Sequence, residues 1–169
     1  MNTFKKYLDK SFQVLLWFAM ALLVVMVLIV FSNVVLRYGF SSGIKWGEEV
    51  PLIIVIWFTF IAMALGVKED LHISITVFTM RANQFVNDLL NLLKYSIELC
   101  IGVIIFRYGW LLTLNGLKSF LPATHITNAI NYIILPISAI FIIGYSFFYL
   151  VENIKDIRLT SKKGRIKNV

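Results

Sequence analysis

Four long apolar segments, separated by short polar stretches, organise the 169-residue chain. Each segment is long enough, at 1.5 Å of rise per residue, to cross a hydrocarbon core of about 30 Å. We therefore expect an all-α integral membrane protein with a membrane domain over 1–155, a basic tail over 156–169 and four transmembrane helices at about 12–36, 45–67, 86–114 and 128–152.

Composition and the first segment both support a protein that stays in the membrane. The hydrophobic share is 59% and the mean hydropathy is +0.83, whereas soluble domains are nearer half apolar. A charged start precedes the first apolar segment, as in a signal peptide. That segment is, however, much longer than the usual h-region of about 7–15 residues, and no A-x-A-like site follows it. We expect a retained first helix.

The net charge of +7 comes mainly from basic residues near the ends of the predicted helices. The stretches before the first helix, between the second and third, and after the fourth are the richest: Lys5, Lys6, Lys10, Lys68, Arg81, Lys155, Arg158, Lys162, Lys163, Arg165 and Lys167. The positive-inside rule then places both termini in the cytoplasm. We expect the basic tail to lie against anionic lipid headgroups of the bilayer and not to bind nucleic acid.

The segment between the second and third predicted helices is short and mixed in polarity. A lone strand could not satisfy its backbone groups at a membrane. We therefore expect a short interfacial helix there, with Ile73, Val77 and Phe78 dipping into lipid. His72, just before it, is expected to be an interfacial anchor bonded to nearby backbone or headgroups.

The third predicted helix carries charges inside its apolar segment. At about 100° per residue, Lys94 and Glu98 share one face, and Arg107 lies about 180° from Glu98. Lys94 and Arg107 can snorkel toward opposite interfaces, which leaves Glu98 deeper. We interpret Lys94 and Glu98 as an intramembrane ion pair. A subunit contact and an ion or proton relay stay open as alternatives for Glu98.

Two adjacent carboxylates, Glu48 and Glu49, stand at the start of the second helix. Neighbouring helical residues point about 100° apart, so the two do not face each other as a catalytic dyad must. The helix dipole favours negative charge in the first turn, and Lys45 lies close enough to pair with either.

Catalytic and cofactor chemistry has little support elsewhere. The two histidines, His72 and His125, lie on opposite sides of the predicted topology and cannot jointly ligate one haem iron. No H-E-x-x-H zinc motif is present. The single Cys100 can form no intramolecular disulfide and is expected to be a small packing residue. We expect no enzyme, no cofactor and no metal site in this chain.

An accessory role follows from what a transporter would need. Secondary transporters usually carry repeats and broken helices that meet near the midplane, and this sequence has neither. The alternatives are an accessory membrane subunit of a redox complex, or a small homo-oligomeric channel or exporter.

Three motifs carry a family resemblance. Arg37 closes the first helix in "NVVLRYGF", "W-x-E-E" follows over 46–49, and the second helix ends in "GVKEDLHI" over 66–73. The sequence thereby resembles the small, DctQ-like membrane subunit of tripartite ATP-independent periplasmic (TRAP) transporters. One departure is "ISIT" after His72, where the resemblance would imply an acidic residue.

The resemblance implies a division of labour. A soluble periplasmic protein would capture an organic acid and deliver it to a large membrane subunit in the bacterial inner membrane, which would import it on a sodium gradient. The small subunit would be a scaffold that packs on the large subunit and helps to dock the binding protein. Sialic acid is favoured as substrate on resemblance alone, and C4-dicarboxylates and other sugar acids stay open.

The resemblance also assigns candidate contact residues. One of Glu48 and Glu49 would pair with Arg37 or Lys45, and the other would point toward a partner; in the alternative, both cap the helix and stay solvated. Lys118 and the loop 119–128 are candidates for touching the periplasmic protein, and His72 for touching the large subunit. The full set of candidate contacts is Arg37, Lys45, Trp46, Glu48, Glu49, His72, Glu98 and Lys118.

Overall fold

The computed structural model describes residues 2–70 and 84–166. Its helices are α1 (Asn2–Phe40), α2 (Glu49–Lys68), α4 (Gln84–Gly116), α5 (Ala129–Tyr132) and α6 (Ile134–Ile166). The expected interfacial helix and His72 lie outside the described residues. The segment 156–166, expected as part of a tail, continues α6 as helix.

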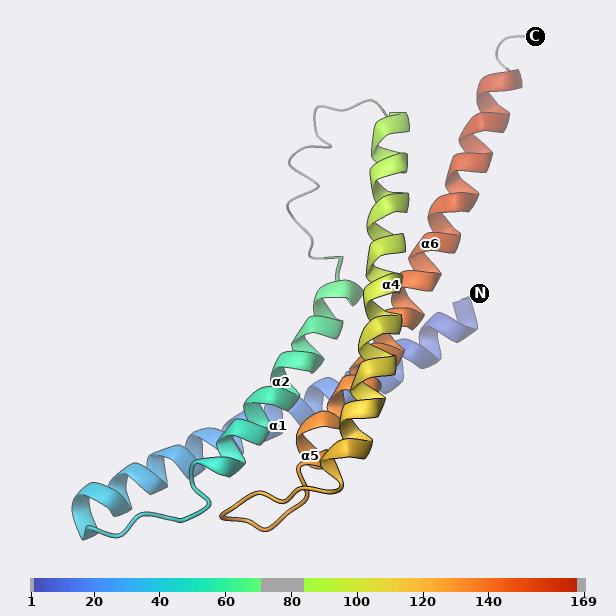
Figure 1. The fold of residues 1–169 in the computed structure, drawn as a ribbon. Coiled ribbons are helices and arrows are strands. Elements are labelled where there is room, and N and C mark those ends of the chain that lie inside the picture. The colour runs from blue at the N-terminus through green and yellow to red at the C-terminus, as the bar shows by residue number, and fades with distance from the viewer. Residues whose placement is uncertain (1, 71–83, 167–169) are drawn as a thin grey trace.

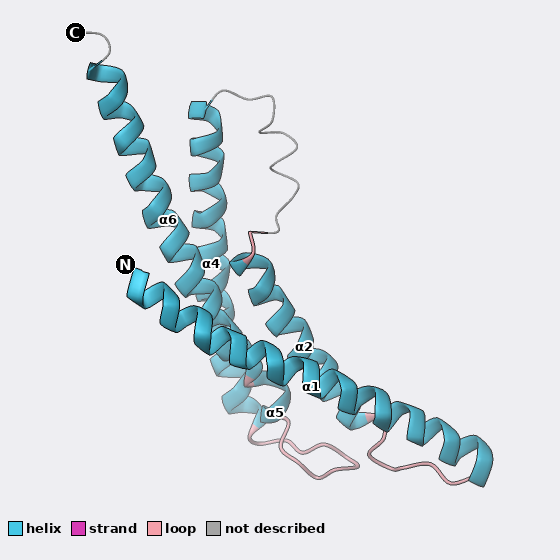
Figure 2. Cartoon of the chain, turned by 180° about the vertical axis from the view of Figure 1, so that it is seen from behind, coloured by secondary structure: helices cyan, strands magenta, loops and turns pink. Residues whose placement is uncertain are grey.

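Helices account for all the regular structure in the described ranges apart from one isolated bridge. α4 and α6 lie side by side, α2 packs on α6, and α1 crosses the others at a slant (Figures 1 and 2). Four helical segments are long and apolar enough to cross a membrane: Lys5–Phe40, Glu49–Lys68, Asn87–Gly116 and Ala129–Lys155. The predicted all-α membrane protein with four spanning helices is confirmed.

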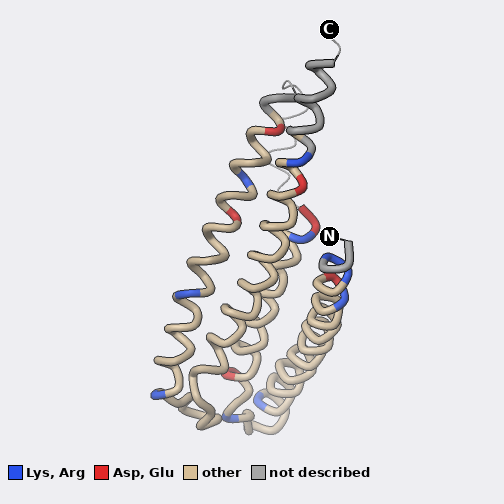
Figure 3. The backbone as a smooth tube through the Cα atoms, turned by 90° about the vertical axis from the view of Figure 1, so that its right-hand side faces the viewer, with Lys and Arg blue, Asp and Glu red and all other residues tan. Residues whose placement is uncertain are grey.

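The two ends of the bundle differ in what they contain. Both chain termini lie at one end, which we call the termini end (Figure 3). The α1–α2 connection and the α4–α5 connection, residues 117–128, lie at the opposite end, which we call the loop end. Most charged residues gather toward these two ends, with a largely uncharged band between them (Figure 3). This distribution suits a bundle that crosses a bilayer.

The start of α2 differs from the prediction. Residues 45–48 form a turn, and the helix begins at Glu49, four residues later than expected. Asn33 of α1 explains the turn, because its Oδ1 accepts the Ile44 N–H at 2.8 Å. Gly47 lies so close to Asn33 that a Cβ there would be 2.7 Å from its side chain. Pro51 then falls in the first helical turn, where a backbone N–H has no intrahelical partner.

Three glycines bring α4 against α5 and α6. Gly102, Gly109 and Gly116 recur every seven residues, which is close to two helical turns, so they share one face. A Cβ at Gly109 would lie 2.6 Å from Leu135 Cβ, and one at Gly116 would lie 2.8 Å from the Ala129 N. Small residues at such positions let the backbones of membrane helices approach closely.

The fourth spanning segment is interrupted near Pro136. Proline has no N–H to donate to the carbonyl four residues earlier, that of Tyr132. The helical run breaks at Ile133, between α5 and α6. Trp57 of α2 ties the interrupted region to its neighbour, since its Nε1–H donates to the Ile130 carbonyl at 2.8 Å.

Candidate functional site

The carboxylate of Glu49 holds the 117–128 loop against the start of α2. Oε1 accepts the Ala123 N–H at 2.7 Å. Oε2 accepts both the Thr124 N–H and the Thr124 hydroxyl, each at 2.9 Å. Ala123 and Thr124 are 74 and 75 positions from Glu49 in the sequence. Hydrogen bonds to an ionised carboxylate are roughly twice as strong as neutral ones, so Glu49 cross-links two connections at the loop end.

The 117–128 loop has a defined backbone shape of its own. The Leu121 N–H donates to the Ile126 carbonyl at 2.8 Å, and the Asn128 N–H donates to the Ser119 carbonyl at 2.8 Å. His125 has a φ of 56° and so lies in the left-handed region. Lys118, at the base of the loop, is exposed. The segment predicted to meet the periplasmic protein is therefore a folded turn with the Glu49 carboxylate bonded to its tip.

The other glutamate lies toward α1. Glu48 Oε1 is 3.7 Å from Arg37 Nη1, and both side chains are largely exposed, at 81% and 66%. Trp46 and Lys45 are also exposed in the preceding turn. The structure thus brings Glu48 to Arg37. Glu49 was expected to pair with Arg37 or Lys45, or to point toward a partner, but its carboxylate is hydrogen-bonded to the 117–128 loop of the same chain. A groove of about 430 Å³ lies beside this pair, between α1 and α2.

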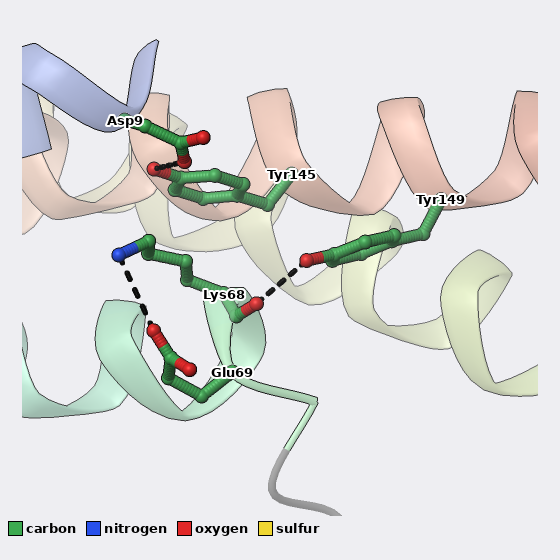
Figure 4. A network of polar contacts seen from close by, with 5 residues as sticks. All are labelled: Asp9, Lys68, Glu69, Tyr145 and Tyr149. Carbon is green, nitrogen blue, oxygen red and sulfur yellow. Dashed lines mark hydrogen bonds and ion pairs between the residues drawn. The ribbon is translucent and has the colours of Figure 1, made fainter. Parts of the chain in front are cut away.

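At the termini end, a polar network joins α1, α2 and α6 (Figure 4). The Tyr145 hydroxyl donates to Asp9 Oδ1 at 3.0 Å, and the Tyr149 hydroxyl donates to the Lys68 carbonyl at 2.6 Å. Lys68 Nζ lies 3.2 Å from Glu69 Oε1. The tyrosines of α6 therefore satisfy polar groups at the ends of two other helices.

We expect Tyr145→Phe to lower the stability of the fold by about 1 kcal/mol, because it deletes the donor to Asp9 inside a fully buried ring position. Thermal unfolding of the purified chain in mild detergent would measure the loss. Tyr108→Phe is the matched control, since Tyr108 is 58% exposed on α4. Equal stability of the two variants would contradict a structural role for the Tyr145–Asp9 bond.

Lys94 has a carboxylate partner that the sequence analysis did not identify. Its Nζ contacts Asp70 Oδ1, just after α2, while the Lys94 side chain is only 6% exposed. The neighbouring Tyr95 stacks on Tyr149 with ring centroids 5.5 Å apart. Glu98 is 7% exposed, and its pairing with Lys94 stays a prediction. A signal for the Asp70 contact was present in the sequence, since Asp70 follows the second predicted helix and Lys94 lies toward the same end of the third.

Comparison with known proteins covers most of these residues. The family described as "Tripartite ATP-independent periplasmic transporters, DctQ component" matches residues 26–158, a range that includes both connections of the loop end. Two Haemophilus influenzae proteins named as TRAP transporter small permease proteins are 27% and 30% identical to this chain. Those alignments cover 91% and 94% of this chain, and 94% and 92% of the relatives.

A third relative matches over a shorter range. The Vibrio cholerae C4-dicarboxylate TRAP transporter small permease protein DctQ is 27% identical over 50% of this chain and 37% of its own length. The family match extends well beyond half of the sequence and takes in the α1–α2 turn with its Trp-x-Glu-Glu motif. This membrane protein therefore belongs to the DctQ family, the small membrane subunits of TRAP transporters.

Proposed function

We propose that this subunit is a scaffold in a bacterial inner membrane. It packs against the large TRAP membrane subunit and helps to dock the periplasmic substrate-binding protein, so that the complex imports an organic acid on a sodium gradient. The observation that carries the proposal is the folded loop end, where Glu49 fixes the 117–128 loop through two N–H groups and a hydroxyl. A preformed surface loses less conformational entropy when a soluble partner binds it.

The sides of the bundle support a contact within the membrane. Much of the apolar surface of α1 is not covered by the rest of the chain: Val24 is 58% exposed, Leu28 59% and Phe31 67%. In a membrane protein such surfaces face lipid or another subunit. A large membrane partner can therefore pack against the sides of this bundle, and a soluble partner can bind at its loop end.

The orientation proposed here follows from charge. Lys5, Lys6 and Lys10 lie in the first turns of α1, and Lys155, Arg158, Lys162, Lys163 and Arg165 lie in the last turns of α6, so both groups are at the termini end. The positive-inside rule favours the cytoplasm for that end, which turns the loop end toward the periplasm, where a binding protein would meet it. Sodium coupling and substrate selection would reside in the partner subunits.

The organic acid that we favour is sialic acid, on the sequence resemblance described above. The name of the Vibrio cholerae relative supports a C4-dicarboxylate as the alternative. Both ligands are anionic, so either agrees with the same scaffold role.

A mild-detergent pull-down through a C-terminal tag, followed by mass spectrometry, tests the proposal. We expect one large polytopic membrane protein to co-purify with the tagged chain and to be missing from an untagged control. Recovery of a homo-oligomer alone, or of a haem- or flavin-bearing companion, would overturn the scaffold role. If the large subunit is recovered as expected, that subunit and the binding protein that it uses would define the transported acid.

A further inference from the structure

Arg107 occupies an unusual depth in α4. It lies thirteen residues from Lys94, at the termini end, and nine from Gly116, where α4 finishes at the loop end. At 1.5 Å per residue these separations are about 20 Å and about 14 Å. Basic side chains snorkel to the headgroups from positions near helix ends. Arg107 is instead about two and a half helical turns inside the nearer end of the spanning segment Asn87–Gly116.

The orientation of Arg107 is as unusual as its depth. Gly109 faces α6 and lies two residues on, about 200° around the helix, so Arg107 is exposed on the side of α4 that faces away from α6. None of the ion pairs formed by the described residues includes Arg107. Within 2–70 and 84–166, therefore, no carboxylate pairs with this intramembrane cation.

The surface around Arg107 is apolar and uncovered. Leu93 is 57% exposed, Val103 49%, Leu111 53% and Leu114 46%, and all lie within about 40° of Arg107 on the helical wheel. Cys100 is exposed on the same side of the helix, so it does not pack against other described residues of this chain. We call these six residues, with Arg107 at the centre, the Arg107 face.

We propose that the Arg107 face packs against a membrane helix of the large subunit, and that this helix carries an aspartate or glutamate at the depth of Arg107. The inference rests on the proposed function, since it needs a large membrane partner. Charged residues inside membranes usually face a bundle interior and pair with an opposite charge. An apolar face with one central cation fits an apolar helix with one central anion.

A second copy of this chain is a poor occupant of the Arg107 face. A parallel copy packed symmetrically on this face would bring one Arg107 toward another, and like charges repel. The described acidic residues of α4 are Asp88 and Glu98, of which Glu98 lies nine residues toward the termini end and is 7% exposed. A parallel second copy packed symmetrically on this face therefore offers no α4 carboxylate at the depth of Arg107.

Co-purification of the large subunit with tagged Arg107 variants tests the inference. We expect Arg107→Leu and Arg107→Glu to reduce the recovered large subunit by about tenfold or more, because each leaves a buried carboxylate unpaired or repelled. Arg107→Lys keeps the charge and should retain more partner than Arg107→Leu. Lys10→Leu is the control, since Lys10 is an exposed cation at the termini end.

Two further measurements separate an interface effect from a folding effect. The thermal stability of each isolated variant chain should match that of the natural chain, because Arg107 forms no ion pair with the residues that the structure describes. A photo-crosslinking amino acid at Leu111, with Arg107 intact, should form a product with the large subunit. Restored recovery when Arg107→Glu is combined with Asp→Lys or Glu→Lys in that subunit would identify the facing helix.

The possible failures are distinct. If the natural chain recovers the large subunit and Arg107→Leu and Arg107→Glu recover as much, the inference is overturned and Arg107 contacts lipid phosphate instead. A Leu111 probe that reacts only with lipid would have the same meaning. If the natural chain recovers no large membrane partner, the proposed scaffold function fails, and this inference fails with it.

Discussion

Replacing Gly116 with alanine is expected to destabilise the bundle by about 2 kcal/mol, because the added methyl group would overlap backbone atoms. A Cβ at this position would lie 2.8 Å from the Ala129 N, 2.9 Å from the Ala129 Cα and 3.0 Å from the Asn128 carbonyl carbon. A side chain could rotate away from such a contact, but these atoms belong to the main chain at the start of α5. Relief would require α4 and α5 to separate.

Gly66→Ala is the matched control for this substitution. Gly66 lies inside α2, and a Cβ there would meet nothing within 4 Å. Alanine is favoured over glycine inside a helix by about 0.5–1 kcal/mol, so this variant should be slightly more stable than the natural chain. Denaturation in mild detergent, followed by circular dichroism, would compare the two. Equal stabilities would mean that the α4–α5 junction can relax and that Gly116 is not needed for close packing.

The spanning helices could be predicted because membrane segments have a strong local signal. Long uncharged runs specify helices in a bilayer, where every backbone polar group must be satisfied within the segment. The glycines that pack α4 on α5 and α6 also had a local signal, their seven-residue spacing over 102, 109 and 116. The sequence held no such signal for which helices these glycines contact, since that depends on how the helices associate.

The contacts of the site could be predicted only in part. Arg37 and Glu48 flank one short turn, so their approach was foreseeable from the sequence. The partners of Glu49 could not be foreseen, because its carboxylate oxygens accept hydrogen bonds from backbone N–H groups 74 and 75 positions away. Backbone donors have no residue-type signature, and any loop that reaches the carboxylate could supply them. The later start of α2 has a similar cause, since it depends on Asn33 in another helix.

Glu49→Gln and Glu49→Ala are expected to release the 117–128 loop without dismantling the bundle. Glutamine retains one acceptor oxygen but loses the negative charge, and alanine leaves the Ala123 and Thr124 N–H groups without their acceptor. Amide hydrogen exchange at these two residues should accelerate by about tenfold or more, since exchange reports local opening. The large subunit should still co-purify, because the helix packing described here does not use this carboxylate. Uptake that depends on the binding protein should fall.

Glu48→Gln separates this effect from a general loss of negative charge at the loop end. Glu48 lies next to Glu49, but it is 81% exposed and its only described ion pair is the 3.7 Å contact with Arg37, a kind of surface pair that contributes little. Its substitution should leave exchange at Ala123 and Thr124 unchanged. Thr124→Val removes only the hydroxyl donor and should give an intermediate acceleration. If Glu49→Gln and Glu48→Gln exchange alike, Glu49 does not fix the loop. If Glu49→Gln loosens the loop while uptake stays normal, the loop shape is real but the binding protein does not depend on it.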